Sequence, residues 1–194
     1  MNIASYESDL TDAQWEFLQP MLPEPKKLGR PPTDRRRVIN AILYVLKGGV
    51  PWRLLPQSFR PCKTVYHIFR KWSRDHTWAA LNDALRVCLR TAQGRHKQPS
   101  AAILDSQSVK SDGHGGEAFA QWVREHWPKL QVEVVKRSDS VQGFAVMPRR
   151  WVVERTFGWL MRHRRLVRDY ERTEASAESW IYLAMIGLPL RRLA

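Results

Sequence analysis

The sequence predicts a mostly α-helical protein with a small α/β part in its second half. Apolar residues recur at helical spacing in several segments before residue 91 and again after residue 147. Two short apolar runs, at 101–104 and 130–135, have the length of strands and enclose a helical pattern. The polar stretch at 91–100 marks a boundary, so we expect two domains, 1–95 and 96–194.

The charge of the chain predicts a polyanionic partner, because its formal net charge is +13 and its pI is near 10.3. Cys62 and Cys88 form no CxxC pair, so neither a disulfide framework nor a zinc site is indicated. The N-terminus is too polar for a signal peptide, and no apolar run approaches the roughly 20 residues of a membrane helix. We expect a soluble cytoplasmic protein that binds no membrane.

Two helices are expected near the N-terminus. Thr11 and Gln14 have the spacing of a capping box, which predicts a helix over residues 12–21. A second helix is expected over residues 34–47, where a pair of glycines follows the last apolar position. A third helix over residues 62–75 and a fourth over residues 78–90, with Cys88 facing inward, complete the first half.

The segment at residues 23–37 joins the first two helices and combines four prolines with six cations. Proline keeps such a segment extended and charge keeps it solvated, as in an arm laid along nucleic acid. Arg30 lies in a Gly-Arg-Pro sequence of the kind that inserts an arginine into a narrow minor groove. A plain solvated linker fits the same composition equally well.

The third helix is expected to separate apolar from basic residues. Its inward residues are Val65, Ile68, Phe69 and Trp72. Two helices joined by a turn, the second of them basic, indicate a helix-turn-helix-like DNA-binding domain, although the connector is longer than usual. An ordinary amphipathic helix with a solvated basic face is the alternative. The DNA-binding residues expected in this half are Arg30, Arg35, Arg36, Arg37, Lys63, Arg70, Lys71 and Arg74.

The second half begins with a predicted crossover unit. The apolar run at 101–104 ends at Asp105, and acids at the carboxyl end of a buried strand point into the crevice where α/β proteins place their sites. A helix and the strand at 130–135 follow, so the two strands should be parallel.

The segment from Pro148 to Tyr170 is expected to form a helix crowded with arginine. A single early acid, Glu154, is either a salt-bridge partner or a metal ligand beside a polyanion. A last helix should begin after Thr173 and reach about Leu188, where Pro189 ends or kinks it. The apolar residues expected to share a face of the arginine-rich helix are Trp151, Phe157, Leu160 and Met161.

Several motifs resemble those of the DDE transposases of bacterial insertion sequences, in the group called insertion sequence five. They are LTDAQWEFLQPMLP and KTVYHIFRKWSRD in the first half, and AILDSQSVKSDGHGGE and FAVMPRRWVVERTFGWLMRHRRLVRDYE in the second. The resemblance implies a ribonuclease-H-like catalytic domain, binding to the element's terminal inverted repeats, and cutting and rejoining of double-stranded DNA with Mg²⁺ or Mn²⁺. It also implies a bacterial protein of the cytoplasm and nucleoid.

The resemblance assigns roles to the two acids. Asp105 matches the first catalytic, metal-binding aspartate and Glu154 the final catalytic glutamate. Arg150 matches the signature arginine. The family's tyrosine and lysine positions are occupied by Met147 and Met161 instead, with Arg162 beside the latter as a stand-in. DNA contacts in this half are expected from Arg149, Arg150 and Arg162.

A further departure is that the interval between Asp105 and Glu154 is less than half that of the family, and the second catalytic aspartate falls in the missing part. Asp112 and Asp139 are the candidate replacements, and a solvated turn residue is the plainer interpretation of each. Because a two-metal reaction needs several carboxylates, the incomplete ribonuclease-H-like domain predicts impaired catalysis.

The expected function is therefore that of a transposase-family protein that binds inverted repeats and is catalytically impaired. The alternatives are a non-catalytic regulator or inhibitor of transposition, which occupies the element's ends or pairs with intact transposase, and a remnant with no role. The shortened second half is expected to be poorly ordered, or else to bury its apolar faces in a homodimer.

Overall fold

The computed structural model describes residues 6–24, 33–59, 61–99, 103, 121, 124–125 and 151–194. Within these ranges every regular element is a helix, as expected for the α-helical part. Of the expected strand at 101–104 only Ile103 is described, and it is 41% exposed. The expected strand at 130–135 lies outside the described residues. So do five residues singled out by the sequence: Arg30, Asp105, Asp112, Asp139 and Met147, together with the two arginines at 149 and 150.

Contacts divide the chain into two compact units, Met1–Ser100 with Phe157–Ala194, and Ala101–Thr156. The first unit thus takes in a C-terminal part that lies beyond the expected boundary at residue 95. The two expected domains, as units of function, stay a prediction. None of the helices in the described ranges is long and apolar enough to cross a membrane.

The first two helices have the caps that the sequence predicts. Helix α1, Asp12–Leu18, begins at Thr11 with a complete capping box and continues into the short 3-10 turn η1, Gln19–Met21. Helix α2, Arg35–Gly48, begins at Asp34, whose carboxylate accepts the Arg37 backbone N–H. It ends at Gly49, where φ is 67°, a left-handed conformation that glycine adopts without strain.

The connector after α2 contains two 3-10 turns, η2 at Trp52–Leu54 and η3 at Gln57–Phe59. Helix α3, Cys62–Arg74, and helix α4, Thr77–Ala92, follow it. The predictions of these two helices are confirmed, with ends that differ by one or two residues. The α2–α3 connection is longer than a helix-turn-helix turn because the two 3-10 turns fill it.

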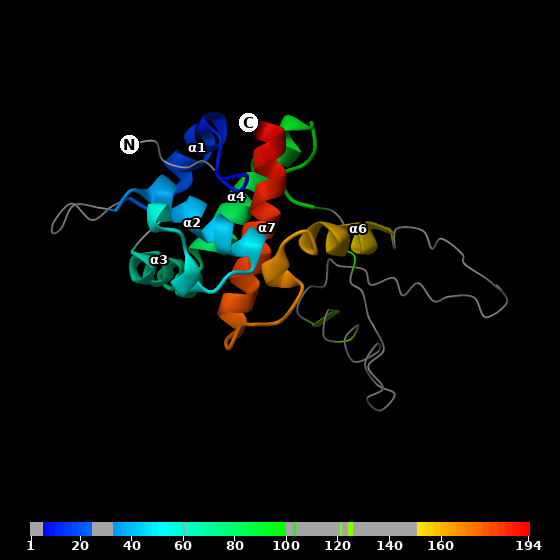
Figure 1. Ribbon diagram of the computed structural model, residues 1–194. Helices are drawn as coiled ribbons and strands as arrows, with labels where there is room; N and C mark the ends of the chain where they lie inside the picture. The colour runs from blue at the N-terminus through cyan, green and yellow to red at the C-terminus, as the bar shows by residue number, and fades with distance from the viewer. Residues whose placement is uncertain are drawn as a thin grey trace, which may run out of the picture. The chain divides into compact units, whose positions relative to one another are not determined.

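Helix α7, Glu174–Leu193, begins at Thr173 as predicted and packs most extensively against α4. It also contacts α1, α2 and α3, and Figure 1 shows it running among them. The prediction that Pro189 ends or kinks the helix near Leu188 was wrong about its end. Pro189 lies inside the helix and, with Leu190, is buried in the core. This packing offsets the backbone hydrogen bond that proline cannot donate.

The predicted helix from Pro148 to Tyr170 was also wrong in extent. Helix α6, Trp151–Leu160, is followed by a turn and by η4, Arg164–Leu166. Of the expected apolar face, Leu160 packs against the core, whereas the other three are about half exposed: Trp151 48%, Phe157 54% and Met161 53%. The chain turns after α6 so that Leu160 and Leu166 both reach the core, which one continuous helix does not achieve for them.

The core of the first unit is rich in aromatic rings. Phe69 stacks on Trp180 with ring centroids 4.4 Å apart, and Trp52 stacks on the same tryptophan at 5.6 Å. Trp180 comes from α7 and is fully buried, as is Trp78 of α4 to within 2%. Helix α7 therefore completes a core whose other buried members come from the first hundred positions.

Candidate nucleic-acid interface

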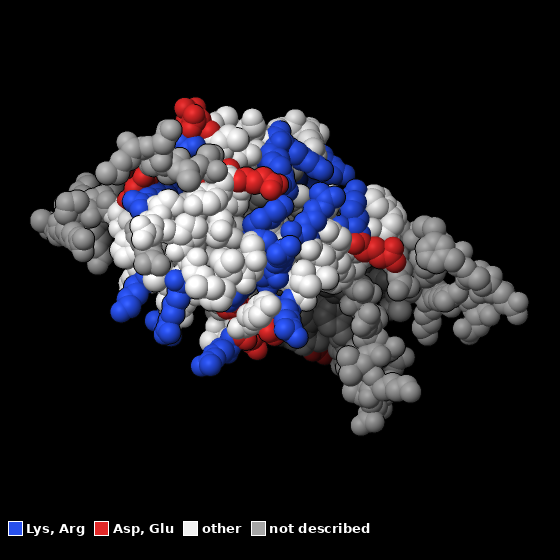
Figure 2. All heavy atoms as spheres, viewed as in Figure 1, with Lys and Arg blue, Asp and Glu red and all other residues white. Residues whose placement is uncertain are grey.

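Helix α3 carries its apolar and its basic residues on opposite faces. Val65, Phe69 and Trp72 are buried, which confirms three of the four predicted core positions, while Ile68 is partly buried. Lys63, Arg70 and Arg74 are seven and four positions apart and therefore lie on one side of the helix, with Lys71 beside them. All of them are solvent-exposed: Lys63, Arg70, Lys71 and Arg74. In Figure 2, basic side chains project into solvent from the region of α3.

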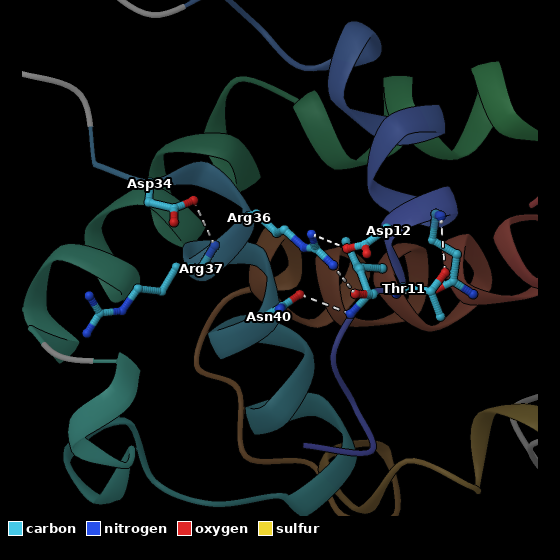
Figure 3. Close-up of polar contacts among 8 residues, drawn as sticks. Thr11, Asp12, Asp34, Arg36, Arg37 and Asn40 are labelled. Carbon is cyan, nitrogen blue, oxygen red and sulfur yellow. Dashed lines mark hydrogen bonds and ion pairs between the residues drawn. The ribbon is translucent and has the colours of Figure 1, made fainter. Parts of the chain in front are cut away.

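The start of α2 carries three successive arginines with different surroundings, and Figure 3 shows two of them, Arg36 and Arg37. Arg36 donates to the Leu10 carbonyl at 2.8 Å and pairs with the Asp12 carboxylate at 2.6 Å. Arg37 points the other way, and its Nη2 lies 3.5 Å from the Gln57 carbonyl. Arg35 is half-buried. The guanidinium of Arg36 thus connects the start of α1 to α2. The position of Arg36 in the basic segment of the sequence does not predict this structural role.

The arginine-rich segment after α6 also divides into two kinds of residue. Arg165 is largely buried and forms an ion pair with Glu171, with its Nε 2.9 Å from the carboxylate. Its guanidinium lies over the ring of Trp180, 5.4 Å from the centroid. Arg162, which was predicted to bind DNA, is exposed. Arg165 therefore fixes the segment to the core, while Arg162 and Arg164 stay at the surface.

His163 lies between these arginines and is partly buried. Burial, and to a smaller extent the positive charges of Lys47 and Arg191, together lower its pKa from 6.5 to about 4. Its Nδ1 is buried without a hydrogen-bond partner among the described residues. His163 is therefore neutral at physiological pH, in surroundings that disfavour a further positive charge.

The depressed pKa of His163 predicts a pH-dependent stability. The unfolded histidine takes up a proton near pH 6.5 and the folded one near pH 4, so stability is lost as pH falls through this window. Glutamine does not take up a proton, so the His163→Gln variant should lose less stability than the parent protein as pH falls. Allowing for solvent screening of a partly exposed ring, we expect the difference in the free energy of unfolding to be about 1–2 kcal/mol. Urea unfolding of both proteins at pH 7.5 and 4.5 measures the difference. An identical pH dependence of the two would contradict the prediction.

Glu154, the predicted final catalytic acid, lies in the first turn of α6 and is exposed. On the same helix, the Arg155 guanidinium stacks over the Trp151 ring at 4.3 Å. No group of three or more histidine, cysteine or acidic residues within the described ranges has a geometry that holds a metal ion. Since Asp105 lies outside those ranges, Glu154 is the one predicted ligand whose position is described.

Comparison with known proteins places this basic helical protein among the transposases. A family model described as a transposase of the IS4/5 family matches residues 10–82, and one described as "Transposase DDE domain" matches residues 109–191. The insertion element IS402 uncharacterized 16.2 kDa protein of Burkholderia cepacia is 33% identical over an alignment of 113 residues, and the match covers 55% of this chain and 76% of that protein. The chain belongs to the IS4/5 family of transposases. No solved structure matches it.

Proposed function

We propose that this protein binds the terminal inverted repeats of its insertion sequence through the exposed face of α3. The observation that carries the proposal is the separation of faces on α3, where Phe69 and Trp72 anchor the helix while Arg70 and Arg74 face solvent. A helix held this way presents its cations to the phosphates that flank a major groove. Arg35 and Arg37 at the start of α2 extend the same interface in the proposal, as does the basic arm with Arg30.

Arg36 contributes differently in this proposal. Its contacts with Leu10 and Asp12 hold α1 against α2, so it supports the interface rather than binding phosphate. The arginines at 149, 150 and 162 would hold DNA near the second half of the chain, where the family reaction takes place.

For the reaction itself, we propose that the second half is an incomplete ribonuclease-H-like domain with impaired cleavage and strand transfer. Asp105 and Glu154 offer the carboxylate oxygens that Mg²⁺ or Mn²⁺ prefers, so these residues fit one ion. When bound, such an ion activates the attacking oxygen or stabilises the leaving one, and a second ion needs a further carboxylate. The chain's own contribution is then to bind and orient the DNA end in the bacterial cytoplasm.

The shortened interval between the two acids favours a second candidate, a non-catalytic regulator. A protein that keeps α3 but lacks a complete acid set would occupy inverted repeats and exclude intact transposase, or pair with it as an inhibitor. Homodimerisation through the half-exposed Phe157 and Met161 is part of either proposal.

A cleavage assay separates the impaired enzyme from an active one. We expect the protein to bind an inverted-repeat duplex and to give no more nicked or joined product with Mg²⁺ or Mn²⁺ than Glu154→Gln gives, because the second metal lacks a ligand. Product would be measured on a strand-labelled duplex by denaturing electrophoresis. Metal-dependent product that disappears in both Asp105→Ala and Glu154→Gln would show that catalysis survives.

A further inference from the structure

A second group of cations lies away from α3 and comes from three separate elements. Lys47 is in the last turn of α2, Arg164 begins η4, and Arg191 is in the last turn of α7. All three side chains belong to exposed residues. In the view of Figure 2, basic side chains gather in a band across the middle of the visible face.

Packing between the elements brings these cations together. The backbone of Arg164 lies against the end of α2, since a Cβ added at Gly49 would be 3.1 Å from the Arg164 Cβ and 3.2 Å from its carbonyl carbon. Element η4 also contacts α7. His163, the residue before Arg164, has both Lys47 and Arg191 as charged neighbours. Arg164 therefore lies beside the end of α2 that carries Lys47, and Lys47 and Arg191 are both close enough to His163 to act on its charge.

The simplest explanation for two of these cations is that they stabilise helix ends. A helix C-terminus carries about half a negative charge, which a lysine or arginine in the last turn offsets. Glu7 adds a further negative charge, 4.0 Å from Lys47, but its side chain is 90% exposed and its effect is screened. Lys47 and Arg191 both disfavour a positive charge on His163. Because a helix end carries only about half a charge, the full charge of a lysine or arginine beside it is not cancelled.

We infer that Lys47, Arg164 and Arg191 form a second phosphate-binding surface, which contacts the backbone of a DNA duplex beyond the segment bound by α3. The three cations stand on an exposed surface and come from elements distant in the sequence, an arrangement that suits an extended polyanion better than a small enclosed anion. The inference rests on the proposed function only in taking DNA as the ligand. It implies that the protein covers more of the duplex than one helix in one groove.

Duplexes of two lengths test this surface, with the full chain and fluorescence anisotropy as the readout. One duplex spans about one helical turn around the α3 site and the other about three turns. We expect the triple variant Lys47→Gln, Arg164→Gln, Arg191→Gln to bind the long duplex at least about 10-fold more weakly, with a salt slope reduced by about two to three. Its affinity for the short duplex should equal that of the parent protein.

The α3 variant Arg70→Gln, Lys71→Gln, Arg74→Gln is the comparison, and it should lose affinity for both duplexes. If the triple variant with Lys47→Gln binds the long duplex as tightly as the parent protein, or loses the same affinity for both duplexes, the inference of a second surface is wrong. If instead the α3 variant keeps its affinity while the triple variant with Lys47→Gln loses affinity for the long duplex, the proposed function of α3 fails and the second surface stands.

A measurement on the unmodified protein guards against misfolded variants. DNA phosphates beside Lys47 and Arg191 would offset their charge and favour the protonated form of His163. We therefore expect the pKa of His163, followed by NMR of its ring protons, to rise from about 4 when the long duplex is bound. A pKa that is unchanged by the long duplex would overturn the inference.

Discussion

Replacing Arg70 and Arg74 together with alanine is expected to weaken binding to inverted-repeat DNA about 100-fold at 0.1 M salt. Each arginine is exposed on the face of α3 opposite the buried Phe69, so each can reach a phosphate or a base edge. Losing one such contact costs about 1–1.5 kcal/mol, and losing two reduces the dependence of log K on log salt by about two. Anisotropy titrations at several salt concentrations measure both quantities.

The matched control for this prediction removes two other cations from the same unit. Arg95 and Lys97 are exposed in the segment after α4 and lie outside the proposed interface. Their joint replacement with alanine changes the net charge equally, and we expect less than about a threefold change in affinity, as for screened long-range charge. Equal losses from both double variants would mean that binding follows net charge and not the face of α3.

Replacing Trp180 with alanine is expected to lower the free energy of unfolding by about 3–5 kcal/mol. Its side chain is fully buried between Phe69 and Trp52, and the smaller residue leaves a cavity in the aromatic core. Because small domains have only about 5–15 kcal/mol of stability in total, the variant would be partly unfolded at moderate temperature. Urea titration followed by tryptophan fluorescence and circular dichroism measures the loss.

Ile181 provides the control on the same helix, since it is the next residue and is 42% exposed. Replacing it with alanine removes a large apolar side chain from the outer side of α7, and the expected loss is below about 1 kcal/mol. A similar small loss for Trp180→Ala would mean that α7 is not needed by the helices of the first half.

The parts of the fold that the sequence predicts well are those set by local signals. Thr11 and Asp34 mark helix starts because each side chain bonds a backbone N–H three residues on. The faces of α3 follow from its spacing alone. The end of the last helix was predicted wrongly because Pro189 by itself favours a helix end. Its burial within α7 outweighs that preference, and no local pattern reveals the burial. The arginine-rich helix was overextended because the turn after Leu160 depends on what that residue packs against.

The candidate site was predictable in its charge but not in how the charges are used. Arg36 was expected to bind DNA along with its neighbours, yet its partners are Asp12 at the start of α1 and Leu10 just before it. Arg165 is likewise committed to Glu171, six residues away and outside helical spacing. Such pairs depend on how distant segments meet. The metal-binding roles of Asp105 and Glu154 stay a prediction.

The order of the two compact units along the chain has a consequence for evolution. The path leaves the first unit at Ser100 and re-enters it at Phe157, so Ala101–Thr156 is an insertion within a single folding unit. The entropy of closing a loop grows only slowly with its length, by about 0.6 kcal/mol for each doubling. Shortening the insertion thus leaves Trp180 and α7 free to complete the helical core. A transposase built this way can lose the middle of its catalytic region and still fold the part that we propose holds DNA.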